Sequence, residues 1–244
     1  NLLISMGAKR KNIFLVDHVG VVFSGRRKDM NPHKEYYAQK TTLRSLSDVI
    51  KGAHIFLGLS VPRILSSEMV STMRDQPLIL ALANPDPEIL PEIALKAKPD
   101  AIVATGRSDY PNQVNNVLCF PFIFRGALDV SATTINEEMK LAAVKALASL
   151  AMEESSETVA NAYMGQDLNF GPEYLIPKPF DLRLIEKIAP AVAKAAMESG
   201  VATNPIKDFT EYRDKLRSHS FRSGMLMKPV IEQAQKASKT LVFA

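Results

Sequence analysis

Four short apolar segments separated by helical stretches constrain the fold of this chain more than any other feature. They are Asn12–Asp17, Ala53–Gly58, Leu78–Ala83 and Ala101–Ala104. Segments this short and this apolar predict strands that are buried on both faces. Strands that alternate with helices form a parallel sheet through crossover connections. The sequence therefore predicts an α/β fold with a doubly wound parallel sheet.

The helices between these strands have recognisable ends. We expect them at Leu46–Ile50, Ser67–Met73 and Pro91–Ala97. Ser45 or Ser47 caps the first, because a serine oxygen accepts a hydrogen bond from the first turn. Pro91 suits the first turn of the third helix, where its missing N–H costs nothing. These helices are the crossovers of the predicted sheet.

Beyond Gly126 the strand pattern stops and a helical C-terminal segment follows. Helices are expected at 128–132, 137–152 and 181–199, with weaker candidates at 206–217 and 225–235. Residues 165–179, which hold three prolines and two glycines, predict a loop. Asn1–Gly7 is typical of the last turns of a helix, and Lys239–Ala244 of a strand cut at its middle. We therefore expect a piece of a longer chain.

Composition excludes several classes of protein. Apolar residues make up 46% and charged residues 23% of the 244, as in globular proteins with a full core. The net charge is +4, but the basic residues are spread along the chain, so nucleic acid is not an expected partner. The apolar run Val117–Phe124 is interrupted by Pro121 and is too short to span a membrane. Cys119 is the one cysteine, which excludes an internal disulfide.

Charged residues follow the first predicted strand. Asp17 ends it, where a carboxylate accepts both ribose hydroxyls of an adenine nucleotide; the alternative is a turn former or helix cap. Cations follow at 24–28 and at His33 and Lys34. Lys34 would pair with a 2′-phosphate and favour NADP over NAD, whereas the alternative is a solvated basic loop.

Polar residues also follow the other strands, at the sheet edge where open α/β folds bind ligands. Gly58 and Ser60 follow the second strand, where glycine permits close approach of a cofactor or forms a plain turn. Asn84 follows the third strand, and residues 105–116 form a polar loop after the fourth that includes Asn115 and Asn116. Amides suit a carboxylate, a hydroxyl and a carboxamide together, although asparagine also caps turns. Two such loops on adjacent strands favour a ligand site.

Motifs for metal or hydrolytic chemistry are missing from the sequence. The four histidines are scattered, and neither HExxH, paired cysteines nor GxSxG occurs. Cys119 lies in an apolar run without a neighbouring histidine, which predicts an inert buried thiol.

Two long segments resemble the nucleotide-binding domain of malic enzymes, Ala81–Glu88 and Arg107–Pro121. Asn1–Asn31 is similar to the helix after the family's glycine-rich turn and to its second strand. Phe122–Ala151 and Gln166–Asp181 resemble the bacterial members, and the stretch from Met227 to Leu241 resembles the junction with a phosphotransacetylase-like domain in hybrid forms. The resemblance covers nearly the whole chain.

The resemblance implies a Rossmann-like domain of an enzyme that oxidises malate with NADP or NAD and releases carbon dioxide and pyruvate. It implies that Asn84 and Asn115 bind the substrate and, with Asn116, the nicotinamide end of the cofactor. It further implies that Asp17 binds the ribose and that Gly58 and Ser60 line the cofactor. Lys34 stands where NADP-using members often carry a cation.

The sequence also departs from the family's pattern. His18 and Val19 stand where many members have Ser and Lys, which leaves the choice between NADP and NAD open. In the family, the tyrosine acid, the lysine base, the carboxylates that hold Mg or Mn and the first glycine turn lie upstream of Asn1. No catalytic residue and no metal ligand is therefore assigned, Tyr110 and Lys178 included, and the chain alone is expected to be inactive.

The resemblance sets the expected organisation and partners. We expect an incomplete NAD(P)-binding domain over 1–151, a helical extension and linker over 152–238, and the start of a further domain over 239–244. Malate is the expected substrate, in a cytoplasmic homo-oligomer without nucleic acid or membrane partners. Two alternatives stay open: another nicotinamide-dependent dehydrogenase, and a non-catalytic nucleotide-binding or assembly module.

Overall fold

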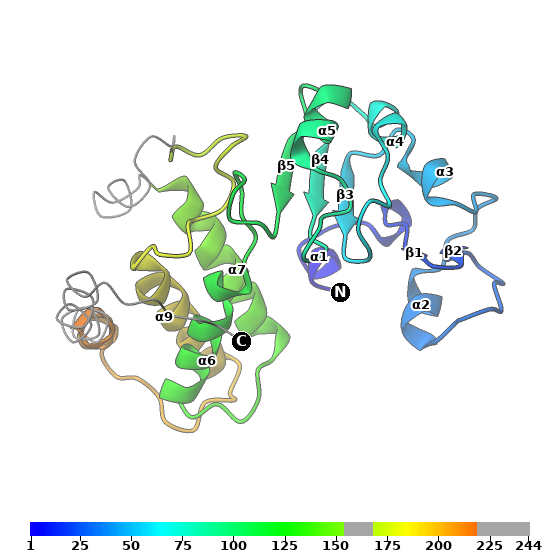
Figure 1. Cartoon of the computed structure of the whole chain (residues 1–244). Coiled ribbons are helices and arrows are strands. Elements are labelled where there is room, and N and C mark those ends of the chain that lie inside the picture. Colours follow the sequence, from blue (N-terminus) through cyan, green and yellow to red (C-terminus); the bar gives the residue numbers. More distant parts are fainter. Residues whose placement is uncertain (154–167, 219–244) are drawn as a thin grey trace, which may run out of the picture. The chain divides into compact units, whose positions relative to one another are not determined.

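The computed structural model describes residues 1–153 and 168–218, which form two compact units. The first contains residues 1–115 and 168–176, and the second contains residues 116–153 and 177–218. Each unit has its own secondary structure, labelled in Figure 1. The predicted domain bounds of 1–151, 152–238 and 239–244 stay a prediction.

A parallel sheet forms the centre of the first unit. Its strands are β3 (Ile55–Gly58), β4 (Leu78–Ala81) and β5 (Ile102–Thr105), in the order β3-β4-β5. Both strand pairs are parallel, and Gly58, Ala81 and Thr105 lie side by side in the register. The three strands therefore end at one edge. This confirms the predicted α/β class and three of its four strands.

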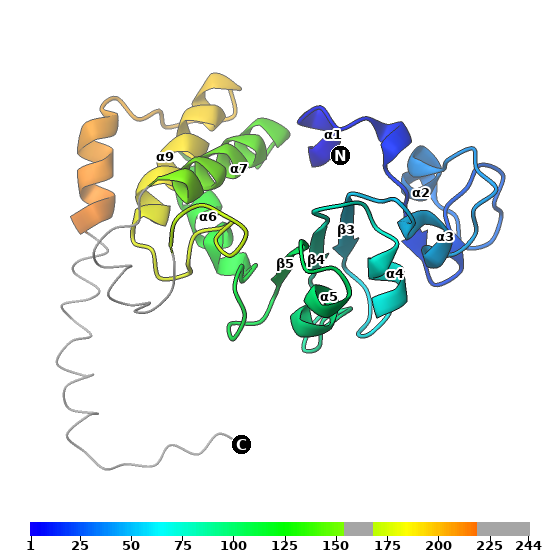
Figure 2. The same cartoon turned by 90° about the horizontal axis from the view of Figure 1, so that it is seen from above.

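Two short helices make the connections of this sheet. Helix α4 (Ser67–Ser71) connects β3 to β4, and α5 (Pro91–Ala97) connects β4 to β5. They contact each other and cover the same face of the sheet (Figure 2). The core between them and the sheet includes Phe56, Val70, Ile79, Ala94 and Val103. Burial of these apolar side chains holds the sheet and the helices together.

The prediction that every strand is buried on both faces is wrong for β3. Ile55 and Leu57 of this strand are 58% and 46% exposed, whereas Phe56 between them is buried. Neighbouring side chains of a strand point to opposite faces. Because α4 and α5 cover one face, and β3 is at the edge of the described sheet, the other face of β3 remains open.

The prediction of a buried parallel strand at Asn12–Asp17 is also wrong. Its first residue lies in the 3-10 turn η1 (Arg10–Asn12), and within this run only Val16–Asp17 form a strand, β1. Strand β1 pairs with β2 (Gly20–Val21) in an antiparallel hairpin, and Phe14 and Leu15 are exposed. Among the described residues, this apolar run therefore belongs to a separate two-stranded hairpin and not to the parallel sheet of β3, β4 and β5.

Three helices accompany the hairpin in the first unit: α1 (Leu2–Ser5), α2 (Pro32–Tyr37) and α3 (Leu46–Ile50). Helix α3 has the predicted bounds. Its cap is Ser45, whose hydroxyl accepts from the Asp48 N–H, while the Asp48 side chain accepts from the Ser45 N–H. This reciprocal capping box explains why a helix of five residues begins here.

The second unit is helical, as expected. It contains η2 (Asn116–Leu118), α6 (Phe120–Asp129), α7 (Glu137–Met152) and α9 (Arg183–Glu198), and residues 209–218 are also helical. Helix α9 packs against α6 and α7. Gly126 allows α6 to lie close to α9, since a Cβ at position 126 would lie 2.4 Å from the carbonyl oxygen of Ala189 in α9. No described helix is long and apolar enough to cross a membrane.

One helix of this unit begins earlier than predicted. The sequence predicts a helix over 128–132, but α6 begins at Phe120 and ends at Asp129. Pro121 occupies its first turn, where a missing N–H leaves no hydrogen bond unmade. The predicted helices 137–152, 181–199 and 206–217 are confirmed, the latter two with shorter or shifted bounds. The predictions for 225–235 and 239–244 lie outside the described residues.

Candidate functional site

Four of the predicted site residues gather at the carboxyl edge of the parallel sheet. Gly58 ends β3, Ser60 follows it, and Asn84 comes after β4. After β5 the chain turns back, and Gln113 pairs with Thr105 in an isolated parallel bridge. The Val114 N–H donates to the Thr105 carbonyl over 2.8 Å, which places Asn115 beside the end of β5. The structure thus brings polar residues from three strand ends to one edge.

The two asparagines at this edge differ in exposure. Asn84 is exposed, and Asn115 is half-buried. The Asn84 amide lies against Gly106, where a Cβ would come within 2.9 Å of Asn84 Oδ1. A larger side chain at position 106 would therefore displace the Asn84 amide. Neither asparagine is sealed in the apolar core, and both lie at the carboxyl end of the sheet.

A buried carboxylate stands behind the loops that carry Ser60 and Asn84. Glu88 is 0% exposed; its Oε1 accepts from the Ser60 N–H and its Oε2 from the Ala83 N–H, both over 3.0 Å. A Cβ on Gly58 would lie 2.4 Å from the Glu88 carboxyl carbon. The space that glycine leaves at position 58 is thus occupied by Glu88. Glycine is therefore required at position 58 to make room for Glu88, in addition to the predicted approach of a cofactor.

Asp17 and Lys34, the other predicted cofactor residues, form a second group. The Arg26 guanidinium donates to both Asp17 oxygens, over 2.9 and 2.5 Å, and Lys34 Nζ lies 2.8 Å from Asp17 Oδ2. The Arg26 side chain is 4% exposed and that of Asp17 15%. The hydrogen bonds from Arg26, together with those from Lys34 and the Val19 N–H, hold the pKa of Asp17 far below its ordinary value despite partial burial.

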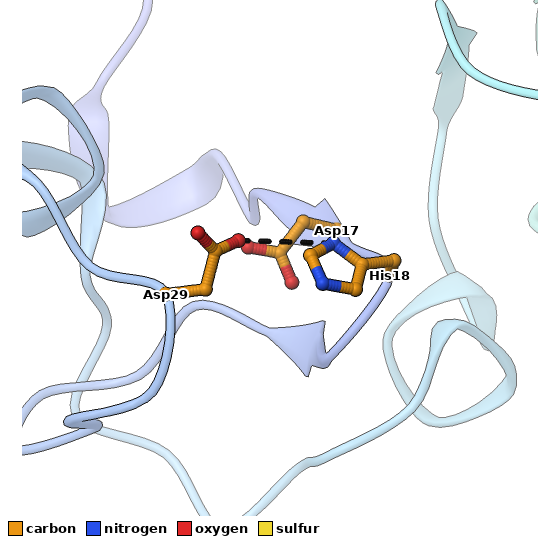
Figure 3. A group of neighbouring side chains, drawn as sticks. All are labelled: Asp17, His18 and Asp29. Carbon is orange, nitrogen blue, oxygen red and sulfur yellow. Dashed lines mark ion pairs between the residues drawn. The ribbon is translucent and has the colours of Figure 1, made fainter.

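Asp29 completes this charged group. Its carboxylate lies 2.5 Å from Lys34 Nζ and 3.7 Å from the His18 ring nitrogen Nδ1. The hydrogen bonds of Lys34 with Asp17 and Asp29 raise the pKa of the lysine. Asp17, His18 and Asp29 each present one atom within 4.8 Å of the others (Figure 3). Because Arg26 and Lys34 already neutralise both carboxylates, these three residues do not form a credible cation site.

Asn112 connects the polar loop after β5 to a distant segment. Its side chain is buried and donates to the carbonyl oxygens of Val103, over 3.1 Å, and Pro172, over 2.7 Å. Its Oδ1 accepts from the Leu175 N–H over 2.7 Å. Asn112 has φ of 54°, a left-handed conformation that asparagine tolerates better than most residues. The loop containing Asn115 and residues 172–175 are thereby fixed to β5.

The last predicted site residue, Asn116, belongs to the second unit. It begins η2 and is exposed. Cys119 in the same unit is half-buried, and burial raises the pKa of its thiol. A raised pKa disfavours the reactive thiolate. The thiol is less buried than predicted, and its inertness stays a prediction.

Sequence reasoning missed three residues that organise these groups: Arg26, Glu88 and Asn112. Arg26 falls within the basic segment 24–28, but neighbouring cations give no signal of which one is buried. Glu88 follows two prolines at the end of a strand, where an acid is typical of an exposed turn. The only signal for Asn112 is the density of amides after β5.

Comparison with known proteins agrees with this geometry. The family model for the malic enzyme NAD-binding domain matches residues 4–163. The NADP-dependent malic enzyme of Escherichia coli K12 is 62% identical over 99% of this chain and 32% of its own length. The NAD-dependent malic enzyme of Rhizobium meliloti 1021 is 59% identical over 99% of this chain and 31% of its own length. The chain thus spans about a third of the length of these curated relatives.

Solved structures show the same architecture. The malic enzyme from Pyrococcus horikoshii Ot3 matches with a TM-score of 0.75 and 34% identity, over 96% of this chain and 52% of that one. The Entamoeba histolytica malic enzyme matches with a TM-score of 0.80 and 28% identity, over 98% of this chain and 48% of that one. The sheet, its polar edge and these matches together show that the chain belongs to the malic enzyme family and contains its NAD-binding domain.

Proposed function

We propose that this chain forms the cofactor-binding part of an NADP- or NAD-dependent enzyme that oxidises malate and releases carbon dioxide and pyruvate. The observation that carries the proposal is the convergence of Asn84 and Asn115 at the carboxyl edge of β4 and β5. Ligands of open α/β sheets bind at this edge. The names of the relatives at about 60% identity support malate as the substrate.

The amides at the sheet edge supply the contacts that such a reaction needs. An Asn amide donates to a malate carboxylate and accepts from a hydroxyl or from the cofactor's carboxamide. We assign these contacts to Asn84 and Asn115, with Asn116 at the nicotinamide end and with Gly58 and Ser60 along the cofactor. A bound nicotinamide would supply the acceptor for the hydride from the hydroxyl carbon of malate. The residues of this chain bind and orient the two molecules for that transfer.

The charged group around Asp17 is the proposed site for the adenosine ribose. The expectation that Asp17 accepts both ribose hydroxyls needs a change, because Arg26 and Lys34 already contact the Asp17 oxygens. A 2′-phosphate would compete with the exposed Asp29 for Lys34, and this exchange favours NADP. The similarity to an NAD-dependent relative keeps NAD as the second cofactor to test. The ratio of kcat/KM for the two cofactors measures this preference.

A divalent metal, Mg or Mn, is implied by the family and would stabilise the enolate oxygen left by decarboxylation. Among the described residues, the one group of three possible metal ligands is the neutralised set of Asp17, His18 and Asp29. We therefore derive no step through a metal from this chain. A cytoplasmic homo-oligomer is part of the same proposal and rests on the resemblance.

Asn115→Ala in the full-length enzyme tests the assignment of the substrate site. We expect kcat/KM for malate to fall by the equivalent of about 1–3 kcal/mol, the usual cost of a lost hydrogen bond to a polar substrate. Steady-state kinetics with malate, NADP⁺ and Mn²⁺ measure the change. Asn204→Ala, which removes an exposed amide from the second unit, serves as the control and leaves kcat/KM unaltered.

Two other outcomes separate the competing functions. Turnover with a different hydroxy or amino acid, but not with malate, indicates another nicotinamide-dependent dehydrogenase. Binding of the nucleotide without any turnover by the intact protein indicates a non-catalytic module. An unchanged kcat/KM in Asn115→Ala removes this residue from the site.

A further inference from the structure

At the carboxyl edge of the sheet, the Glu88 side chain connects the loops after β3 and β4 beyond the last backbone hydrogen bond between these strands. Between β3 and β4, that bond is donated by the Leu82 N–H to the Gly58 carbonyl over 3.2 Å. The Ser60 N–H, in the loop after β3, and the Ala83 N–H, in the loop after β4, both donate to the Glu88 carboxylate. One side chain thus accepts hydrogen bonds from the loops that follow two neighbouring strands.

The same residue also fixes the β3 loop through its backbone. The Leu65 N–H donates to the Glu88 carbonyl over 3.1 Å, and the Arg63 N–H donates to the Pro87 carbonyl over 3.2 Å. The loop between β3 and α4 is therefore fixed near its start by the Glu88 side chain and near its end by the backbone of residues 87 and 88. A loop fixed at both ends holds Ser60 in one position.

Burial of a carboxylate away from water is costly unless both oxygens find donors. The two partners of Glu88 are backbone N–H groups, and the fit leaves room for no Cβ at Gly58. An apolar side chain would fill this space without that cost but would accept neither N–H. The two hydrogen bonds therefore indicate that Glu88 holds the two loops in position and does not merely fill space.

We infer that Glu88 is a positioning residue, which holds the loops bearing Ser60 and Asn84 in the arrangement that orients cofactor and substrate for hydride transfer. The inference rests on the proposed function. Glu88 acts through Ser60 and Ala83, the latter being the residue before Asn84. Its removal is therefore expected to disturb orientation more than binding.

Glu88→Gln in the full-length enzyme is the first test. Glutamine keeps the shape but has one acceptor oxygen, so one of the two backbone N–H groups then faces an N–H donor. We expect kcat for malate oxidation to fall by about tenfold or more while the KM values for malate and cofactor change by less than about threefold. Glu68→Gln removes an exposed carboxylate from α4 as the control and leaves both constants unaltered.

Amide hydrogen exchange supplies a readout that does not depend on activity. In the wild-type enzyme without cofactor, the Ser60 and Ala83 amides are expected to be protected, and in Glu88→Gln at least one loses about tenfold or more of that protection. Rapid exchange at both amides in the wild type overturns the inference even if the variant fails to fold. Unchanged kcat in a folded variant that has lost the protection also overturns it.

Different results would contradict the proposed function and the inference about Glu88. If the wild-type enzyme does not oxidise malate with either cofactor, the proposed function fails, whatever Glu88 does. If the wild-type enzyme is active and Glu88→Gln loses only thermal stability, with kcat and both KM values retained, Glu88 is a structural residue and the inference fails alone.

Discussion

Replacement of Arg26 by methionine is expected to lower the free energy of unfolding by about 3 kcal/mol at neutral pH. Methionine retains an apolar stem but removes the guanidinium that donates to both oxygens of Asp17. It also removes donors to the carbonyl oxygens of Gly20 and Asp29. Because the Asp17 side chain remains 15% exposed, water compensates part of the loss, and we place the effect at the lower end for buried ion pairs.

The pH dependence of this effect has a definite sign. Arg26 lowers the pKa of Asp17 in the folded state, so the pair stabilises the fold at a pH above the ordinary value of an unfolded aspartate, about 4. The stabilisation is lost as the pH falls below that value toward the pKa of the folded state. The difference between wild type and Arg26→Met is therefore largest near neutral pH and shrinks in acid.

Urea unfolding at a series of pH values measures both effects. Arg27→Met is the matched control, because it removes the same charge from the exposed neighbour. We expect the control to change the free energy of unfolding by less than about 0.5 kcal/mol. An equal loss in both variants, or a difference that keeps its full size in acid, contradicts the assignment of the Arg26–Asp17 pair.

Replacement of Asn112 by alanine is expected to lower the free energy of unfolding by about 3 kcal/mol. The change removes hydrogen bonds to the carbonyl oxygens of Val103 and Pro172 and leaves the Leu175 N–H without its acceptor. Alanine also tolerates the left-handed backbone at this position less well than asparagine does. Urea unfolding measures the loss.

Glycine at the same position separates the two causes. Asn112→Gly removes the same hydrogen bonds but accepts the positive φ, so we expect it to be less destabilising than Asn112→Ala by about 1 kcal/mol. Hydrogen exchange at the Leu175 amide accelerates in both variants. If Asn112→Gly restores full stability, the backbone conformation and not the hydrogen bonds explains the effect.

The sequence pattern predicts the sheet edge well, for a clear physical reason. In a parallel sheet all strands end at one edge, so residues that follow apolar segments must come together. Gly58, Ser60, Asn84 and Asn115 do so. The pattern predicts β1 poorly, because an apolar run does not specify its partner. A tight turn between Asp17 and Gly20 creates a hairpin instead.

The periodicity of apolar residues does not predict which side chains contact the site residues. Arg26 contacts Asp17 around the β1–β2 hairpin, a contact that depends on the turn and not on helix or strand spacing. Glu88 is buried because a glycine thirty positions earlier leaves room for its carboxylate. Asn112 depends on residues some sixty positions later. Each of these contacts requires the folded topology before it can be recognised.

The most direct measurement is the structure of the full-length enzyme with malate and the reduced cofactor, a pair that cannot react because the nicotinamide already carries the hydride. We predict that the side chains of Asn84 and Asn115 make hydrogen bonds to malate or to the nicotinamide carboxamide. We also predict that Glu88 still accepts from the Ser60 and Ala83 N–H groups. Malate and nicotinamide bound away from the carboxyl edge of β3, β4 and β5, with both asparagines facing solvent, would contradict the proposed site.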